Sequence, residues 1–526
     1  MPKYLVIRYT FFLILLFFSF WLMWHTLSYD TTTHNILISA KYWSDFGSHL
    51  PQIRSFSLGS NWPPQSPLFP GEPTRYHFLF YFVAGIFERL GMPIDWALNL
   101  NSAIGFFLLT IMIWLFTYRL FTSRLTAYLS VIFFLFNSSL SWLDYLKSNN
   151  FNLISSISNL ASLTQFPSFG PWNGSAITAF WNLNIYTNQR HLGLSFAIAL
   201  LLIYLLQFNH RRYLYLFGFI AGSLVLLNQA ALAIVALFAA SYFIFQPKLR
   251  TPLLLSAVGA VPWLFFSRLI SNDTSQLAWY LGFLTKPPVI WSNFLRFWFL
   301  NIGLHLVFIP LGFLMAPKQA RKLIFPLLVL FIAPNLIKFS TDIINNHKFF
   351  NFFLIIGSMF TAYVLVKIKP LLLLLPLLVL GGIVDFFPVK NDFYFHLPDI
   401  TVNPDAQYFQ KNTLPDSIVL NSTWFYHPAS LAGRKIFNGY SYFTWSFGYD
   451  QATREYQALA IYRAPDSITA CRLLHRNNIS FVELNNRPEN FIFPNWNLWK
   501  NNFSPQYHNP TTGVSIYNVS HICPAT

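Results

Sequence analysis

The sequence predicts a polytopic α-helical membrane protein with a small α/β domain towards its C-terminal end, and three observations support this fold class. Of the 526 residues, 54% are hydrophobic, 19% are aromatic and only 10% are charged, whereas soluble domains contain about 25% charged residues. Long apolar runs recur from residue 9 onwards, and charged residues return after about residue 390. A soluble multidomain enzyme, a disordered chain and a disulfide-rich scaffold are therefore excluded.

The first apolar run covers residues 9–27 and follows Lys3 and Arg8. It is similar to a signal peptide in its position, but it is too long for the apolar region of one. No A-x-A cleavage motif follows it, so we expect a retained first span.

Further apolar runs are each roughly 15–22 residues long, about the length that a helix needs to cross the hydrocarbon core. The weakest is the run from residue 76 to residue 90, which we expect to be a partial or tilted pass. Counting it or not, we expect about 11–13 spans. These runs begin near Tyr76, Ala97, Thr126, Leu192, Tyr213, Ala230, Pro252, Phe294, Ile324, Phe350 and Pro370.

The net charge is +16, from 34 Lys and Arg against 18 Asp and Glu, and the positions of the basic residues fit a membrane topology. Much of it lies in short basic clusters between apolar runs, as is typical of cytoplasmic loops. We therefore expect a multi-pass protein of the cell membrane with a cytoplasmic N-terminus, and no nucleic acid partner. The clusters are Lys3 and Arg8; Arg119 and Arg124; Arg211 and Arg212; Lys248 and Arg250; Lys318, Arg321 and Lys322; Lys367 and Lys369.

This topology predicts two domains. Residues 1–390 form the membrane domain, with a first external loop over residues 28–75, and residues 391–526 form an extracytoplasmic α/β domain in which short alternating runs lie between helix-like stretches. Both cysteines, Cys471 and Cys523, fall in the second domain. In an oxidising compartment they could form a disulfide; the alternative is two unpaired small apolar residues.

The first external loop carries the candidate catalytic residues. The spacing D-x-x-x-H occurs twice, from Asp30 to His34 and from Asp45 to His49. On a helix this spacing places the carboxylate and the imidazole on one face. A carboxylate beside apolar surface can have a raised pKa and act as a general base. The alternative is that each aspartate caps a helix; we expect the cap for Asp30 and the base for Asp45.

The later half of this loop is rich in proline, which prevents a regular helix. Arg54, Arg75 and His77 lie here as candidate binding residues. The rigid backbone either holds polar groups over a cavity or makes a re-entry turn with interfacial aromatic anchors.

Two more polar clusters precede apolar runs on the external side. The first, residues 181–191, ends in Arg190 and His191, and the second, residues 338–348, contains Asp342, His347 and Lys348. Cations at the external mouth of a helical bundle suit a phosphate group. The alternatives are snorkelling to lipid headgroups and a simple pair between Asp342 and Lys348.

Several motifs are absent from the sequence. It contains no Walker A motif, no G-x-G-x-x-G before a helix, no H-E-x-x-H and no C-x-x-C. A nucleotide site is therefore not supported. The first loop has no D-x-D triplet, so we predict no metal site and no cofactor, and a divalent metal has no motif in its favour.

The order of these features resembles the GT-C superfamily of integral-membrane glycosyltransferases, especially protein-mannosyltransferase-like and RgtA/B/C/D-like members. Residues 67–82 are similar to a P-x-x-x-G-x-P-x-x-Y-x-x-x-x-Y segment of membrane proteins grouped with it. Residues 431–435, 438–440 and 448–450, with Arg454, look like the terminal domain of those proteins.

The resemblance implies a sugar donor carried on a polyprenyl phosphate in the bilayer and an acceptor, protein or glycan, on the outer side. It implies an acidic base in the first external loop, here Asp45 or alternatively Asp30. It also implies basic residues that hold the lipid phosphate, here Arg190 and Lys348. The sequence departs from the pattern because no paired acidic motif follows the first span.

Two other classes remain open. A transporter or lipid flippase would need polar residues deep in the spans or helices broken within the membrane, and Asn228-Gln229 is the polar pair that stands out. A non-catalytic scaffold would use the outer domain to bind a partner.

Overall fold

The computed structural model of the chain describes residues 3–170, 174–270, 277–489 and 491–523. Residues 171–173 and 271–276, which lie between apolar runs of the sequence, are outside the described residues. The chain forms two compact units. Unit 1 comprises residues 1–25, 100–265 and 275–393, and unit 2 comprises residues 26–99, 266–274 and 394–526.

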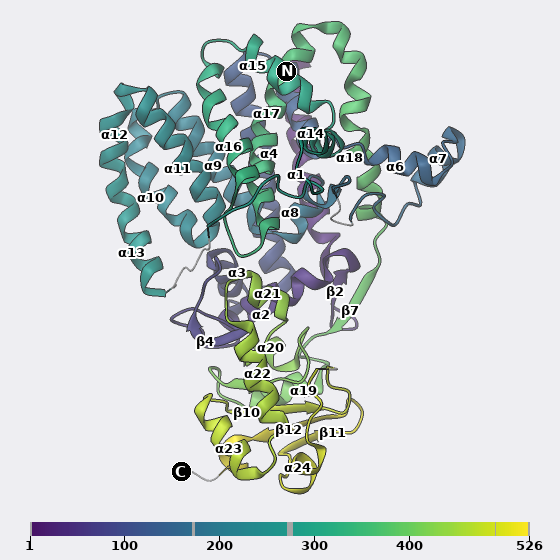
Figure 1. Cartoon of the computed structure of the whole chain (residues 1–526), viewed down its shortest axis with the longest axis vertical. Helices are drawn as coiled ribbons and strands as arrows, with labels where there is room; N and C mark the ends of the chain where they lie inside the picture. The colour runs from purple at the N-terminus through teal and green to yellow at the C-terminus, as the bar shows by residue number, and fades with distance from the viewer. Residues whose placement is uncertain (1–2, 171–173, 271–276, 490, 524–526) are drawn as a thin grey trace. The chain divides into compact units, whose positions relative to one another are not determined.

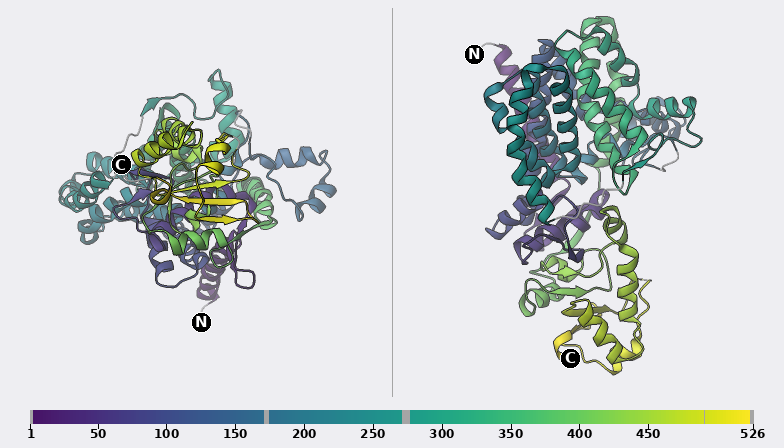
Figure 2. Two further views of the ribbon diagram at one scale, coloured as in Figure 1. Left: turned by 90° about the horizontal axis from the view of Figure 1, so that it is seen from below. Right: turned by 60° about the vertical axis from the view of Figure 1, so that its left-hand side comes forward.

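Unit 1 is a bundle of helices (Figure 1). Its packing is apolar, and one of its cores joins aromatic residues such as Trp181, Trp298 and Phe350. The teal helices of residues 211–257 lie side by side in the right-hand view of Figure 2. Its main helices are α1 (Lys3–Trp24), α5 (Arg124–Leu135), α6 (Ser141–Ser148), α7 (Leu153–Leu160), α8 (Asn184–Asn188), α9 (His191–Gln207), α10 (Arg211–Leu227), α11 (Gln229–Phe245), α12 (Pro247–Ala257), α14 (Trp291–Ile302), α15 (His305–Met315), α16 (Ile324–Leu336), α17 (His347–Lys367) and α18 (Leu375–Lys390). Two further helices, α4 (Ile94–Phe121) and α13 (Val261–Ile270), have part of their residues in each unit.

Within the described ranges, four helical segments are long and apolar enough to cross a membrane, or five if one bent pair counts as a span. Further apolar helices of 10–17 residues accompany them, so the multi-pass helical fold class is confirmed. The predicted run at residues 76–90 becomes α3 (Leu79–Arg89), whose 11 residues are too short to cross about 30 Å of hydrocarbon. The four segments are Ile94–Phe121, Pro247–Ser267, Ile343–Lys367 and Lys369–Lys390.

The apolar run predicted from Phe294 is not one straight helix. It breaks between α14 and α15, which are bent by 89°. Gly303 lies at the break with a φ of +54°, and a Cβ there would lie 1.9 Å from the carbonyl oxygen of Ser138. The reason is therefore a glycine that permits both the left-handed backbone and the close approach of another segment.

The segment between the apolar runs that begin near Thr126 and Leu192 also contains helices. Figure 1 shows α6 and α7 projecting sideways from the other helices of unit 1. They are held together by the Tyr145 hydroxyl, which donates to the carbonyl of Ser156 at 2.6 Å. On α7 the apolar side chains of Leu153, Ile154 and Ile157 are exposed while Ser156 is buried, so this short helix turns its apolar face outward.

Unit 2 joins residues 28–75, the loop predicted to be external, to the C-terminal residues. The antiparallel sheet β1-β2-β7 pairs β1 (Leu27–Asp30) and β2 (Asn35–Ser39) with β7 (Tyr394–Pro398), in the register Ile36↔Leu397. The division predicted at residue 390 therefore needs correction for residues 26–99. They share strands with the C-terminal domain, so they belong to its compact unit.

The C-terminal domain is α/β, as predicted. Its five-stranded sheet has the order β11-β12-β10-β8-β9, with β8 parallel to both β10 and β9 (yellow and green in Figure 2, left). Adjacent residues of β8 alternate between faces: Val419 packs in one core and Leu420 in another. The strands are β8 (Ile418–Leu420), β9 (Lys435–Ile436), β10 (Phe481–Asn485), β11 (Tyr507–Asn509) and β12 (Val514–Asn518), and the helices α19 (Pro404–Asn412), α20 (Pro428–Leu431), α21 (Ser441–Ser446), α22 (Gln451–Tyr462), α23 (Ser467–Arg476), α24 (Trp496–Asn501) and α25 (Val519–Ile522) accompany them.

The two cysteines of this domain are bonded. Cys471 of α23 and Cys523, which follows α25, form a disulfide with an S–S distance of 1.99 Å. Of the two alternatives left open by the sequence, the disulfide is therefore the one that the structure contains.

Candidate functional site

Helix α2 (Trp43–Ser57) positions the candidate base in unit 2. Asp45 lies in its first turn, and His49 follows one turn later, so both lie on one helix face as predicted. Among the described residues, no hydrogen bond reaches the Asp45 carboxylate. Its side chain keeps a partly exposed face, but the surrounding protein atoms remove water from it, and this burial raises its pKa to about 6. A carboxyl group of this kind is suited to accept a proton near neutral pH.

Two tyrosines lie near Asp45. Burial raises the pKa of Tyr76 and of Tyr426, and the negative charge of Asp45 raises both further. The Tyr426 hydroxyl donates a hydrogen bond to the carbonyl of Trp43, and the two rings lie 4.1 Å apart. Residues of the C-terminal domain therefore frame the first turn of α2. Sequence reasoning missed Tyr426, because 381 residues separate it from Asp45 and no local pattern marks the contact.

Asp30 has a different environment. It ends β1, and the residues up to His34 make the turn of a β-hairpin, so the predicted helix cap at Asp30 is wrong. The three β-branched threonines favour strand or turn over helix. The Thr33 hydroxyl and the Thr32 amide donate to the two carboxylate oxygens of Asp30 at 2.6 and 2.8 Å. These hydrogen bonds, the Thr33 hydroxyl first, lower the pKa of Asp30.

Arg54, on the same helix as Asp45, is held by two carboxylates. Its Nε lies 2.9 Å from Glu88 Oε1, and one of its terminal nitrogens lies 3.0 Å from Asp399 Oδ1. Its side chain is 5% exposed. This network joins α2, α3 and the C-terminal residues. The predicted contact of Arg54 with substrate stays a prediction.

Arg75 and His77 hold the proline-rich loop. Arg75 pairs with Glu72 at 2.8 Å, donates to the carbonyl of Gly448 and lies 4.9 Å from the centre of the Tyr449 ring. His77 is buried, and its ring centre lies 3.6 Å from that of Tyr76. After α2 ends at Ser57, the loop contains the hairpin of β3 (Gln65–Ser66) and β4 (Phe69–Pro73) and no regular helix, as its prolines predict. The prediction is wrong for Arg54, which lies in the last turn of α2.

In unit 1, the second and third polar clusters meet. Gln189, the residue before Arg190, has its side-chain nitrogen 3.1 Å from His347 Nε2. His347 in turn precedes Lys348 at the start of α17. Two segments about 160 residues apart in the sequence therefore lie side by side. A shared phosphate site at this place stays a prediction.

The cations of these clusters are buried. Arg190 is 1% exposed and donates to the sulfur of Met23 at 2.9 Å. His191, also buried, begins α9. Lys348 is 6% exposed, and its Nζ donates to Asn345 Oδ1 at 3.2 Å. Asp342 accepts the amide N–H of Ile344 at 3.0 Å and so caps the short helical turn before α17.

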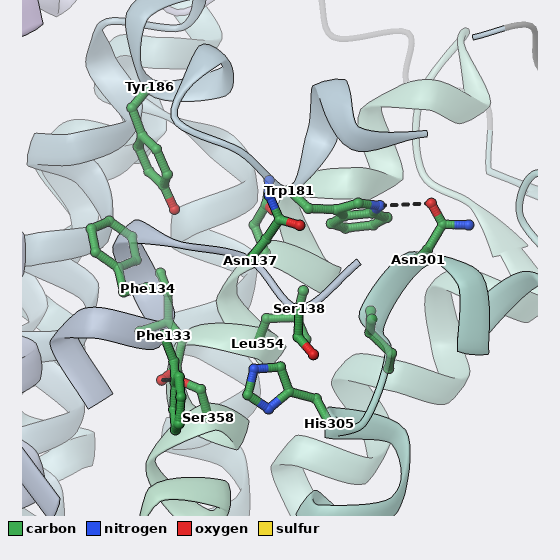
Figure 3. Close-up of a pocket in the computed structure, with 13 residues that line it drawn as sticks. Phe133, Phe134, Asn137, Ser138, Trp181, Tyr186, Asn301, His305, Leu354 and Ser358 are labelled. Carbon is green, nitrogen blue, oxygen red and sulfur yellow. Dashed lines mark hydrogen bonds between the residues drawn. The ribbon is translucent and has the colours of Figure 1, made fainter. Parts of the chain in front are cut away.

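A polar cavity lies among α5, α8, α15 and α17 of unit 1, and Figure 3 shows its walls. Asn301 accepts a hydrogen bond from Trp181 Nε1 at 3.0 Å. Asn351 connects the cavity with the basic cluster, because its amide nitrogen lies 3.0 Å from His347 Nδ1. The lining residues are Phe133, Phe134, Asn137, Ser138, Trp181, Tyr186, Asn301, Ile302, His305, Asn351, Leu354, Ile355 and Ser358.

A buried carboxylate lies beside this cavity. Asp385 of α18 accepts a hydrogen bond from Asn137 at 3.2 Å and is 1% exposed. No role was assigned to Asp385 from the sequence. Its presence as a lone acid in an apolar run was a signal for a role inside the bundle.

The predicted residues thus divide between the units. Asp30, Asp45, His49, Arg54, Arg75 and His77 belong to unit 2, and Arg190, His191, Asp342, His347 and Lys348 belong to unit 1. Within the described ranges, no three His, Cys, Asp or Glu residues form a group that could hold a metal ion. The expectation of no metal site and no cofactor stays a prediction.

Comparison with known proteins identifies the fold. No family model matches the sequence, and no curated protein matches it. Among solved structures, ArnT from Cupriavidus metallidurans in the apo state is similar over 100% of both chains, with a TM-score of 0.53 and 11% identity.

Two oligosaccharyltransferase structures from Archaeoglobus fulgidus also align. One, a complex with zinc and sulfate, covers 97% of this chain and 74% of that one at a TM-score of 0.41 and 14% identity. The other is AglB in complex with an inhibitory peptide and a dolichol phosphate. The similarity covers 90% of this chain and 69% of that one, at a TM-score of 0.37 and 13% identity. The full-length similarity to ArnT carries the conclusion: the chain has the fold of the GT-C membrane glycosyltransferases.

Proposed function

We propose that this protein is a membrane glycosyltransferase that moves a sugar from a polyprenyl phosphate to an acceptor hydroxyl on the extracytoplasmic side, with Asp45 as the general base. The observation that carries the proposal is the environment of the Asp45 carboxylate. It lies on an ordered helix, free of hydrogen bonds from the described residues, and burial raises its pKa to about 6. The GT-C fold supports the reaction class.

The contrast with Asp30 favours Asp45 as the base. The hydrogen bonds that lower the pKa of Asp30 also occupy its oxygens. A carboxylate with a lowered pKa binds a proton weakly and is a poor base. The oxygens of Asp45 remain available to an acceptor hydroxyl.

The basic cluster of unit 1 supports an anionic leaving group. Arg190 and Lys348 lie at the N-terminal ends of α9 and α17. Helix N-termini carry partial positive charge and bind phosphate groups. The Gln189–His347 contact brings these two helix ends together. The cations would stabilise the charge that develops on the departing phosphate.

In the proposed step, the acceptor oxygen forms a bond to the anomeric carbon while its proton passes to Asp45. The bond from the anomeric carbon to the phosphate oxygen breaks, and the polyprenyl phosphate leaves with the electron pair. Attack opposite the leaving group inverts the configuration at the anomeric carbon. His49 lies one turn from Asp45 and would orient the base or the sugar.

A lipid flippase or transporter is the second candidate. The break between α14 and α15 and the buried Asp385 are features that such proteins place at transport sites. A flippase or transporter would not need Asp45, so the experiment in the next paragraph separates it from the glycosyltransferase.

The experiment uses the purified chain in proteoliposomes with polyprenyl-phosphate hexoses and a panel of glycan and peptide acceptors. We expect Asp45→Asn to lower the rate of polyprenyl phosphate release by roughly 10²–10⁴, and Asp30→Asn to leave it within a factor of about three. Lys348→Met should lower it by roughly 10². Lys367→Met, an exposed lysine at the other end of α17, is the matched control. Release that is equally fast in the Asp45→Asn variant would remove Asp45 from the reaction, and lipid translocation without release would favour the flippase.

A further inference from the structure

Helix α7 presents an apolar face that the rest of unit 1 does not cover. Ile154 and Ile157 are 82% and 74% exposed, and Leu153 and the preceding Phe151 are exposed as well. The three helical positions follow the spacing of one side of a helix. A contiguous exposed apolar patch indicates contact with a protein or a membrane.

The helix lies at the level where a membrane-spanning segment ends. The segment Lys369–Lys390 has 22 residues, about the length that crosses the hydrocarbon core, so Lys390 lies close to a membrane surface. The next residue, Asn391, donates its side-chain amide to the carbonyls of Ala161 and Leu163 at 2.8 and 2.9 Å. Both carbonyls come just after α7. The helix therefore lies near the same surface, on the side that the sequence predicts to be external.

The helix also projects away from the bundle. Helices α6 and α7 extend sideways from the other helices of unit 1 in Figure 1, and the same blue segment extends outward in the left-hand view of Figure 2. With 8 residues, α7 is about 12 Å long and cannot cross about 30 Å of hydrocarbon. It therefore lies beside the spans, where lipid surrounds the bundle, without being a span itself.

The serines of α7 are compatible with lipid because their hydroxyls bond to their own helix. Ser155 and Ser156 both donate to the carbonyl of Asn152, at 3.1 and 2.7 Å. Ser158 donates to the carbonyl of Ser155 at 3.0 Å. The Asn152 side chain caps the helix by accepting the amide of Ile154 at 3.0 Å. Polar groups that are already hydrogen-bonded cost little to remove from water.

The composition of the segment favours lipid over a protein partner. No charged residue occurs between Lys147 and Arg190 in the sequence. Protein interfaces are enriched in Tyr, Trp and Arg, and α7 contains none of these. An uncharged helix also gains nothing from the attraction between basic residues and anionic lipids. Apolar contact with neutral lipid is therefore the interaction that this face offers.

We propose that α7 is an interfacial helix that inserts its apolar face into the bilayer beside the span Lys369–Lys390. Its partner is the zone of a neutral bilayer where headgroups meet acyl chains, and an interfacial helix buries its apolar face about 5–10 Å deep there. The bonds from Asn391 connect α7 with the end of the span, so the helix fixes the depth of that end. The surface involves neither Asp45 nor the sugar donor, and it stands or falls independently of the proposed function.

Quenching by spin-labelled lipid in nanodiscs measures the depth of α7. The full chain carries Ile154→Cys with an environment-sensitive fluorophore, and the two native cysteines are held in the disulfide. Each phosphatidylcholine nanodisc holds one chain, and its lipid carries the spin label near the start or near the end of the acyl chain. We expect the probe to lose at least about half of its fluorescence with the label near the headgroups, and less with the deep label. Leu414→Cys, at a side chain of the C-terminal domain that is 71% exposed, is the matched control and should keep its fluorescence.

A thermal unfolding scan checks that the labelled chain is folded, and Ile157→Cys is a second site on the same face. Replacing part of the neutral lipid by phosphatidylglycerol should leave the quenching unchanged. Quenching at Ile154 no stronger than at Leu414, stronger quenching by the deep label, or an increase with phosphatidylglycerol would each overturn the proposal. A probe that becomes shielded only when two chains share a disc would also overturn it, because the partner would then be a second copy of this chain.

Discussion

Arg54 carries a positive charge into the interior of unit 2, where Glu88 and Asp399 surround it. Ser57 adds a hydrogen bond to Glu88 at 2.5 Å. In a buried network of this kind, the loss of one partner leaves the others charged and unpaired. The network therefore fixes α2 against α3 and against the residues after β7, and in doing so it positions the helix that carries Asp45.

We expect Arg54→Met to destabilise the protein by about 3–5 kcal/mol, because two buried carboxylates lose their cation. Arg89→Met, at an exposed arginine next to Glu88, should change stability by less than about 0.5 kcal/mol. Thermal unfolding followed by size-exclusion chromatography measures both. Equal melting temperatures in the two variants would mean that the network does not hold α2.

At the residue scale, the sequence pointed to Asp30 and Asp45 as candidates but could not predict the surroundings of either carboxylate. Asp30 and Asp45 share the spacing D-x-x-x-H, yet one lies in a hairpin turn and the other in a helix. The pKa of each depends on hydrogen bonds and burial. The neighbours Tyr76 and Tyr426 come from distant segments, so no local pattern could reveal them.

At the element scale, the segment from Asn137 to Leu140 organises part of unit 1. It ends α5 and passes close to two glycine sites: a Cβ at Gly382 would lie 2.3 Å from the Asn137 amide nitrogen, and one at Gly303 would lie 1.9 Å from the Ser138 oxygen. Leu140 also donates its N–H to the carbonyl of Leu300 at 2.8 Å. Irregular backbone inside a helical bundle is tolerated where it is buried in protein or lines a cavity, and here it lines the cavity of Figure 3.

Gly303→Ala tests this arrangement. We expect a loss of about 3 kcal/mol or more, because the new Cβ meets a backbone oxygen and the positive φ adds strain. Gly91→Ala is the control: Gly91 has a φ of +97° but open space around its Cβ position, so strain alone should cost about 1 kcal/mol. The fraction of folded protein after heating, measured by fluorescence size-exclusion, compares the two. Similar losses would argue that close packing at the break contributes nothing.

Hydrophobic runs predicted the helices of unit 1 well, because each apolar run needs a helix to satisfy its backbone in lipid. They did not predict the break at Gly303, although Asn301, Gly303 and His305 interrupt the apolar run at that point. The helices α6 and α7 were also missed, because serines begin and end α6 and are frequent in α7, and such residues are typical of loops.

At the scale of the whole molecule, the disulfide between Cys471 and Cys523 ties the end of the chain to α23 across a separation of 52 residues. Disulfides persist in oxidising compartments, which supports the predicted extracytoplasmic location of the C-terminal domain. Cores on both faces of the five-stranded sheet complete this domain.

We expect the double variant Cys471→Ser, Cys523→Ser to be less stable by roughly 4 kcal/mol, from the loop that the bond closes. A reductant should lower the stability of the wild type by the same amount, and it should leave the stability of the double variant unchanged. Maleimide gel shifts on the unreduced protein should show two blocked thiols. A shift of both cysteines without reduction would contradict the bond and the location that it supports.

Composition and charge order predicted the membrane class and the α/β character of the C-terminal domain, because both depend on sums over many residues. The outer location of that domain stays a prediction. The grouping of residues 26–99 with the C-terminal residues was not predictable, because it depends on strand pairing between β2 and β7 over more than 350 residues.

The central claim is that Asp45 removes the proton of the acceptor, and the pH dependence of single-turnover sugar transfer tests it most directly. A base must be ionised, and the pKa of Asp45 is raised to about 6. Activity should therefore be level above about pH 7 and fall about tenfold per pH unit well below about pH 6. The Asp45→Asn variant should be at least 10²-fold slower at every pH. A rate that stays flat from about pH 5 to 8, or an Asp45→Asn variant that keeps the wild-type profile, would contradict the claim.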